Sequence, residues 1–197
     1  VDGRGWRATK REATRRALAQ AAFDLATERG VRGVTVEDIA HGAGVAPRTF
    51  FNYYTCKEDA VTALVLHRAT AALDTWTPPA HAPVLETVRR MMAHHLDVGT
   101  VDALVTAGEL ARDHPQLLPF LRDAQWRMWL AAGERVTAAL DEPTDDQLLQ
   151  VQALIGALHA VATHALMVDP SGAGAPTAES LRERLAAALR LLGSGMG

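Results

Sequence analysis

The residue types in this chain that could do chemistry gather in one short segment, GVAPRTFFNYYTCKED. Arg48 could form a bidentate pair with guanine, Asn52 could do the same with adenine, and Phe51 could lie against a thymine methyl group or a sugar edge. Helical spacing turns these three side chains outward and turns Phe50 and Tyr54 inward. The segment therefore predicts a short helix, ending at about Tyr54, whose free side can enter a major groove.

Polar and basic side chains beside this helix suit phosphates better than bases. Three of them lie in the same segment: Thr49, Tyr53 and Lys57. Residues 1–9 show no periodicity and predict a mobile arm, and a basic set in or next to it could reach a neighbouring minor groove: Arg4, Arg7, Lys10 and Arg11. A disordered tail with incidental charge stays open as the alternative.

The elements that must position these residues form a helix-turn-helix. Thr35 and Asp38 have the spacing of a capping box, which predicts that a helix starts at Thr35, and we include Thr35 among the residues expected to contact DNA. Gly42 and Gly44 bracket the turn, where a positive φ costs glycine little. Pro47 suits the first turn of the second helix, because its missing N–H would have no partner there.

Here the chain resembles the tetracycline-repressor (TetR) family of bacterial transcription regulators, whose commonest form is Gly-Val-Ser-x-x-Thr-Phe/Leu-Tyr/Phe-x-Tyr/His-Phe-x-Ser-Lys-Glu. The positions that match are Gly44, Val45, Thr49, Phe50, Phe51, Tyr53, Lys57 and Glu58. Ala46 and Cys56 depart from the pattern, since a capping Ser or Thr is usual at both, and each missing cap costs about 1 kcal/mol. Cys56 also raises the hypothesis of a redox switch, with a poor helix cap as the alternative.

The resemblance implies an all-α homodimer with about nine helices in each subunit. It implies that Pro47, Arg48 and Phe51 face bases. It also implies that three residues hold the DNA backbone: Thr49, Tyr53 and Lys57. We expect a DNA-binding domain over residues 1–56 and an effector-binding and dimerisation domain over residues 57–197. Within the second, a long helix from Lys57 to about Trp76 is expected to link head and body.

Composition agrees with a protein that meets DNA at one end. The net charge is −3, but residues 1–57 hold ten Lys/Arg against six Asp/Glu, while the rest hold ten against seventeen. Such an asymmetry would orient the chain on a duplex. No apolar run of about 18 residues and no signal segment are seen, and the single cysteine fits a reducing compartment, so we expect a cytoplasmic protein without a membrane partner.

The penultimate helix has two apolar stripes, which predict that it is buried on two sides. One stripe would face the core and one a second subunit, and the residues assigned to a dimer interface with the last helix are Leu148, Ile155, Leu158, Leu185 and Leu189. The alternative is that both stripes are core. A flat second side of the same helix carries Ala153, Gly156, Ala157 and Ala160.

Large and amphipathic side chains in the middle of the body are candidates to line an effector pocket: Met91, Met92, His95, Trp126, Met128, Trp129 and His159. Ordinary core packing is the alternative for each. The histidine spacings do not share a helix face, so we expect no metal and no other cofactor. No nucleophile, base and orienter come together, so we expect no enzyme.

The expected function is a repressor that a small molecule releases from a palindromic operator. The alternative is a helical protein that sequesters a small molecule and whose head no longer binds specific DNA.

Overall fold

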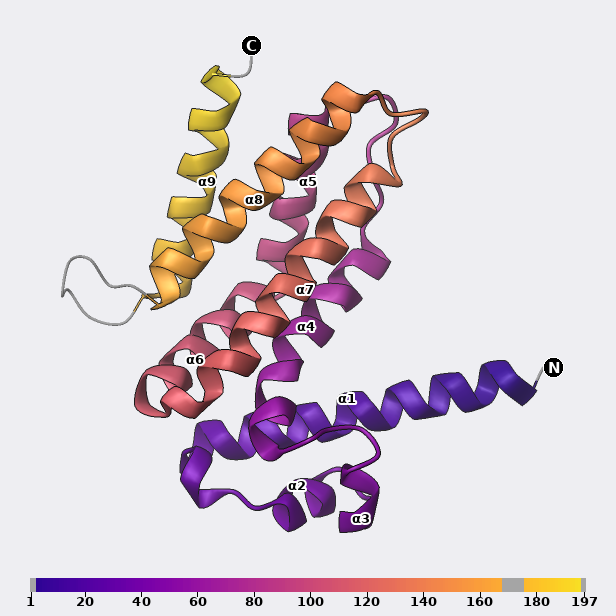
Figure 1. Ribbon diagram of the computed structural model, residues 1–197, viewed down its shortest axis with the longest axis vertical. Coiled ribbons are helices and arrows are strands. Elements are labelled where there is room, and N and C mark those ends of the chain that lie inside the picture. The colour runs from indigo at the N-terminus through magenta and orange to yellow at the C-terminus, as the bar shows by residue number, and fades with distance from the viewer. Residues whose placement is uncertain (1–2, 168–175, 196–197) are drawn as a thin grey trace.

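The computed structural model describes residues 3–167 and 176–195, apart from the side chains of Arg4 and Asp97, and within these ranges it contains helices and no strand. The predicted all-α class is confirmed. The helices form a small head below an elongated body (Figure 1).

The head consists of the first four elements. They are α1 (Gly3–Arg29), the short 3-10 helix η1 (Val31–Gly33), α2 (Val36–Gly42) and α3 (Pro47–Phe50). Leu18, Ile39 and Phe50, one from each α-helix, are fully buried together. The helices α1 and α2 cross closely at Gly42, since a Cβ there would lie 3.2 Å from that of Ala21. This close crossing fixes where α3 can stand.

Local sequence explains how the head elements start and stop. The predicted capping box is present, because the Thr35 hydroxyl accepts from the Asp38 N–H while the Asp38 carboxylate accepts from the Thr35 N–H. Gly30 ends α1 with φ 71°, and Gly44 makes the turn after α2 with φ 68°. Gly42 has no positive φ, so the turn does not require glycine there. Its missing side chain instead allows α1 and α2 to pack closely.

The expected mobile arm is wrong for residues 3–9. The helix α1 already starts at Gly3, and Figure 1 shows its N-terminal half projecting away from the rest of the head. Residues Trp6 to Arg11 contain no helix breaker and several good helix formers, so α1 continues through them.

The helix α4 (Lys57–Thr75) joins head and body, as predicted. It packs against α1 at its start and lies beside α7 further along. Trp76 leaves the helical conformation, and Pro78 and Pro79 prevent its continuation. One continuous helix therefore touches both parts of the molecule.

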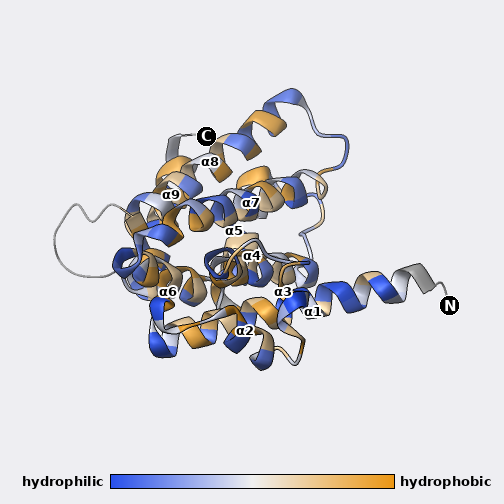
Figure 2. Cartoon of the chain, turned by 60° about the horizontal axis from the view of Figure 1, so that its bottom comes forward, coloured by the Kyte–Doolittle hydropathy of each residue, from blue (hydrophilic) through white to orange (hydrophobic). Residues whose placement is uncertain are grey.

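The body contains five further α-helices in the described ranges. They are α5 (Val84–Asp97), α6 (Thr100–Asp113), α7 (Leu118–Thr137), α8 (Asp145–Met167) and α9 (Ala178–Gly195), with η2 (Pro115–Leu117) before α7. The helices α4 to α9 pack with their apolar sides toward one another (Figure 2). The penultimate and last helices expected from the sequence correspond to α8 and α9.

The helix α8 is unusual in how much apolar surface it leaves uncovered. A second capping box starts it, in which Thr144 and Gln147 exchange backbone and side-chain hydrogen bonds of 3.0 and 3.3 Å. Within the described residues it is the one helix long and apolar enough to cross a membrane. Only 33% of its most apolar stretch is buried, although α8 packs on α5, α7 and α9.

Candidate nucleic-acid interface and body cavities

The helix α3 is a single turn, so the predicted helix to Tyr54 is too long as an α-helix. Its first residue is Pro47, and Ala46 provides no side-chain cap, as its type predicts. The chain continues as tight turns, in which the N–H groups of Tyr53 and Tyr54 both donate to the Phe50 carbonyl at 2.9 and 3.1 Å. These bonds keep residues 47–54 in one rigid, helix-like segment.

The outward side of this segment carries the residues that sequence spacing assigned to bases. Phe50 and Tyr54 are buried, while Arg48 and Asn52 are exposed and Phe51 is 63% exposed. Phe51 rests edge-on against Phe50, with ring centroids 5.4 Å apart. The Arg48 and Asn52 side chains make no hydrogen bond or ion pair with any described residue. Their donors and acceptors are therefore free for base edges.

Beside this row, Thr49 and Tyr53 are half-buried and Pro47 is exposed. The hydroxyl of Thr35 is already occupied, because it donates to the Asp38 carboxylate at 2.7 Å and accepts from the Asp38 N–H. These hydrogen bonds from Thr35 hold the pKa of Asp38 below its usual value. The role of Thr35 in this structure is that of a helix cap.

Lys57 is the clearest difference from the predicted phosphate contacts. Its Nζ donates to the carbonyls of Val31 and Val34, both at 2.8 Å, so two of its three N–H bonds are used inside the head. The ammonium group ties the end of η1 to the start of α4. Sequence reasoning missed this because the two carbonyls lie more than twenty residues before Lys57.

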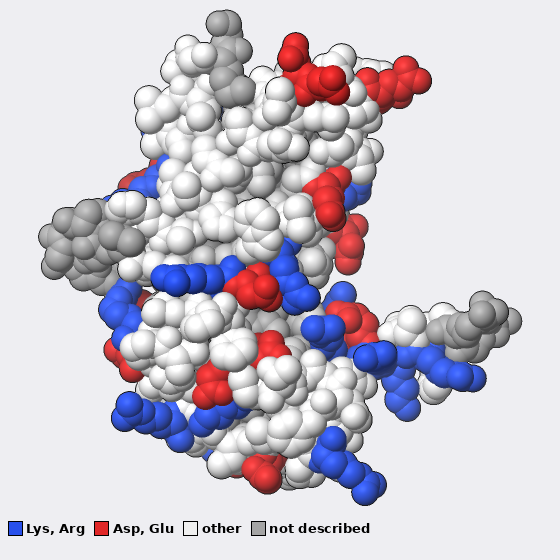
Figure 3. Space-filling model, in the orientation of Figure 1, with Lys and Arg blue, Asp and Glu red and all other residues white. Residues whose placement is uncertain are grey.

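The basic side chains of α1 stand on a rigid helix. Arg7, Lys10 and Arg11 are exposed, and Lys10 Nζ lies 5.1 Å from the centre of the Trp6 ring. The side chain of Arg4 lies outside the described residues. Figure 3 shows basic side chains along the projecting part of α1 and at the lower edge of the head, whereas acidic ones occupy the far end of the body. The predicted asymmetry of charge is therefore present in space.

A hydrogen-bonded junction that the sequence did not indicate connects the head to α4. The Tyr54 hydroxyl lies 2.9 Å from both the Arg15 carbonyl and His67 Nε2, and His67 Nδ1 lies 3.5 Å from a Glu12 carboxylate oxygen. Burial raises the pKa of Tyr54 to about 12. Burial also lowers the pKa of His67 and outweighs the opposite effect of Glu12. Three segments, α1, the end of the α3 segment and α4, meet at this junction.

The predicted effector residues do not share one cavity. Met91, Met92, His95, Met128 and Trp129 line a core cavity of about 30 Å³, which is room for one water molecule. His95 Nδ1 lies 3.0 Å from the Met91 carbonyl, and burial lowers the pKa of its ring. This half of the prediction is corrected, because these side chains are packed core.

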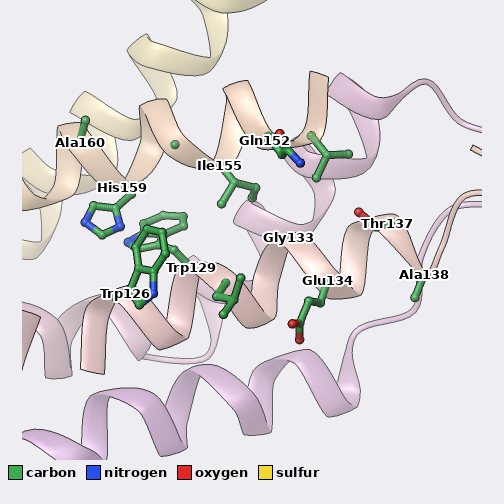
Figure 4. Close-up of a pocket in the computed structure, with 13 residues that line it drawn as sticks. Trp126, Trp129, Gly133, Glu134, Thr137, Ala138, Gln152, Ile155, His159 and Ala160 are labelled. Atoms are coloured by element: carbon green, nitrogen blue, oxygen red, sulfur yellow. The ribbon is translucent and has the colours of Figure 1, made fainter. Parts of the chain in front are cut away.

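The other half of the set lines a larger space between α7 and α8. This groove of about 700 Å³ has Trp126, Trp129 and His159 at one end and extends past Gly133 and Ile155 (Figure 4). The Trp126 and Trp129 rings lie 5.8 and 6.4 Å from that of His159. Burial lowers the pKa of His159. The sequence could indicate the aromatic end but not the small residues that leave the groove open.

The prediction of which leucine and isoleucine residues form a dimer interface is mostly wrong. Ile155, Leu158, Leu185 and Leu189 are buried inside the protomer, and only Leu148 is half-buried. The flat side of α8 is exposed instead at Ala153, Gly156 and Ala160, and Leu191 of α9 is 73% exposed. Periodicity identified two sides of α8 but assigned the wrong one to the surface.

Comparison with known proteins gave one family model and several solved structures. Residues 18–64 match the family model described as bacterial regulatory proteins, tetR family. A comparison with curated proteins found no match. Among solved structures, the chain is similar to a TetR transcriptional regulator from Rhodococcus sp. RHA1, with 16% identity, coverage of 93% of this chain and 97% of that one, and a TM-score of 0.56. A TetR-family regulator from Rhodococcus sp. is 18% identical over 91% of this chain and 98% of its own, with a TM-score of 0.51.

These similarities support the fold over the whole chain, and the family model covers the segment that carries the exposed α3 residues. Within the described residues, no group of three or more His, Cys, Asp or Glu side chains could hold a metal ion. Residues 18–64 therefore match the tetR family of bacterial regulatory proteins, and the whole chain has the fold of solved TetR-family regulators.

Proposed function

We propose that this regulator is a cytoplasmic, homodimeric repressor that binds a palindromic operator and that a small molecule bound in its body releases it from DNA. The observation that carries the proposal is the row of Arg48, Phe51 and Asn52 on the outward side of the α3 segment. Their polar groups are free, and the buried Phe50 fixes the segment below them. We assign DNA binding to residues 1–56 and effector binding and dimerisation to residues 57–197.

Dimerisation is proposed because one turn of helix contacts too few base pairs for specific binding. Two heads related by a two-fold axis would contact half-sites one helical turn, or a multiple of it, apart. The uncovered surface that suits a second copy is the flat side of α8 around Ala153 and Ala157 together with Leu191 of α9. Small side chains allow two such helices to approach closely, and the pairing would cover the exposed apolar surface around Ala153, while Gly156 and Ala160 remain in the wall of the groove between α7 and α8.

The helix α4 offers a physical route from effector to DNA. Its first residue is bonded to η1, its middle is bonded to Tyr54 through His67, and its remaining length packs against α7, which forms one wall of the groove. A ligand that prefers a displaced α7 would shift α4 and change the separation of the two heads. The ligand acts only through its different affinity for the two arrangements.

Titration of the protein with two duplexes tests DNA recognition. One duplex carries the DNA upstream of the gene for this protein and one is random, and each is titrated at two salt concentrations. A specific regulator should prefer the upstream duplex by about a thousandfold or more. Equal, salt-sensitive binding of both would instead support a sequestering protein whose head associates with DNA without sequence preference.

A further inference from the structure

The α7–α8 groove has a chemical character that restricts its ligand, and this inference rests on the proposed function of the groove as an effector site. Of the thirteen residues that line it, one is formally charged, Glu134, and none is Lys or Arg. Glu134 forms no ion pair with any described residue. Its neighbour Arg135 is directed elsewhere, donating to the Trp76 carbonyl at 3.3 Å and lying over the Trp76 ring. A negatively charged ligand would therefore find no cation here.

The aromatic end of the groove also favours positive charge. Trp126 and Trp129 present indole rings, whose faces attract cations. His159 of α8 packs against both indoles, and burial lowers its pKa and so disfavours the charged form of its ring. Trp126 is 59% exposed in the protomer, so its ring is not occupied by core packing.

The shape of the groove suits an extended or flat molecule. The wall from Trp126 to Ala138 is about 18 Å of helix. Gly133 and Gly156 keep the floor open, since a Cβ at Gly133 would lie 3.8 Å from Ile155 and one at Gly156 would meet nothing within 4 Å. Trp129 lines both the groove and the core cavity, and its buried Nε1 has no hydrogen-bond partner among the described residues.

We propose that the α7–α8 groove binds an aromatic organic cation, with its rings against Trp126 and Trp129 and its positive charge toward the Glu134 carboxylate at the rim. Acidic ligands such as carboxylates and phosphate esters are disfavoured, because the unpaired Glu134 would repel them and the lining offers no basic side chain.

Three probes that share one ring system test the charge preference. Pyrenemethylamine, pyrenemethanol and pyrenecarboxylate differ mainly in charge, and energy transfer from tryptophan to pyrene reports their binding to the full-length protein. The amine should bind about three- to fivefold more tightly than the alcohol, and the carboxylate should bind most weakly. Glu134→Gln should bring the amine and the alcohol to within about twofold of each other. Glu109→Gln, an exposed acid on α6, is the matched control and should change nothing.

Two further variants establish where the probes bind. Gly133→Val fills the floor of the groove, and Trp126→Ala removes the exposed indole, so each should weaken all three probes. Trp126 is mostly exposed, so its loss should leave the fold intact even if Gly133→Val does not fold. Equal binding of amine and alcohol, tighter binding of the carboxylate, or binding unaffected by Trp126→Ala would overturn the proposal.

Operator binding measured with each probe separates this inference from the proposed function. If the amine binds preferentially but leaves operator affinity unchanged, effector-controlled release is wrong and the ligand class stands. If the alcohol binds as tightly and releases the operator, release stands and the ligand class is wrong.

Discussion

At the scale of single residues, residues 35–57 of the head include side chains that hold the head together and side chains that are left free. Arg48 and Asn52 have no partner among the described residues. The Thr35 hydroxyl instead caps α2, and the Lys57 ammonium group bonds to two backbone carbonyls of the head. Base contacts should therefore depend on the first pair, and the shape of the head on the second.

Arg48→Ala should cost about 1 to 3 kcal/mol of operator affinity, because it removes a candidate bidentate contact to guanine. The loss should be confined to one base position of each half-site, which titration of operators with single substitutions would locate. Arg32→Ala, an exposed arginine in η1, is the control. An equal loss on every sequence would assign Arg48 to phosphate instead.

Lys57→Met should destabilise the protein by about 1.5 to 3 kcal/mol, because two charge-assisted hydrogen bonds to backbone carbonyls are lost. Urea denaturation followed by circular dichroism measures this free energy of unfolding. Lys10→Met, on the exposed part of α1, should leave it unchanged. Unaltered stability of Lys57→Met together with weakened DNA binding would return Lys57 to the phosphate contacts.

At the scale of elements, what sequence could and could not predict follows from the range of the interactions. The capping boxes at Thr35 and Thr144 and the turn at Gly44 involve neighbours in the chain, and all were predictable. The junction of Tyr54, His67 and Glu12 joins residues far apart in the sequence, and no local pattern indicates it. The open groove was equally unpredictable, because it depends on Gly133 facing Ile155 across two helices.

The two errors in helix boundaries and helix faces also differ in whether the local sequence could have prevented them. The helical start of α1 was available from the helix formers between Trp6 and Arg11, so that error lay in weighing the missing periodicity above helix propensity. The error in the dimer leucines has a different cause. Periodicity shows that a stripe must be buried, but it does not show whether the same chain or a second copy buries it.

The junction at Tyr54 gives a prediction at this scale. Its pKa of about 12 lies above the usual value of about 10, so the stability that Tyr54 contributes is complete below about pH 10 and is lost as pH rises toward 12. Tyr53→Phe leaves Tyr54 as the sole tyrosine of the chain. In that variant phenolate absorbance should appear at about pH 12, together with loss of the helical circular dichroism. In denaturant the same protein should titrate near pH 10. Phenolate formation near pH 10 with intact helices would contradict the buried junction.

At the scale of the whole molecule, the two ends have opposite properties. The head carries exposed basic side chains (Figure 3), while α8 and α9 leave small and apolar residues exposed, among them Ala153 and Leu191. The basic end suits a duplex, and the uncovered side suits a second copy. Two copies joined through α8 and α9 would present both heads to one operator.

Ala153→Arg should break the proposed dimer, because it places a charged side chain on the flat side of α8. Sedimentation should then show a monomer, circular dichroism should show unchanged helix content, and operator affinity should fall by about 100-fold, since the two heads no longer bind together. Ala93→Arg, at an exposed site on α5, is the matched control. A dimer that survives Ala153→Arg would place the interface elsewhere.

The edge-on contact between Phe50 and Phe51 has a consequence for how this regulator can change over generations. One ring belongs to the interior of the head and the other to its outer surface, so a substitution among the interior neighbours of Phe50 would tilt the exposed ring. Promoter preference could therefore drift through mutations at sites that never meet nucleic acid.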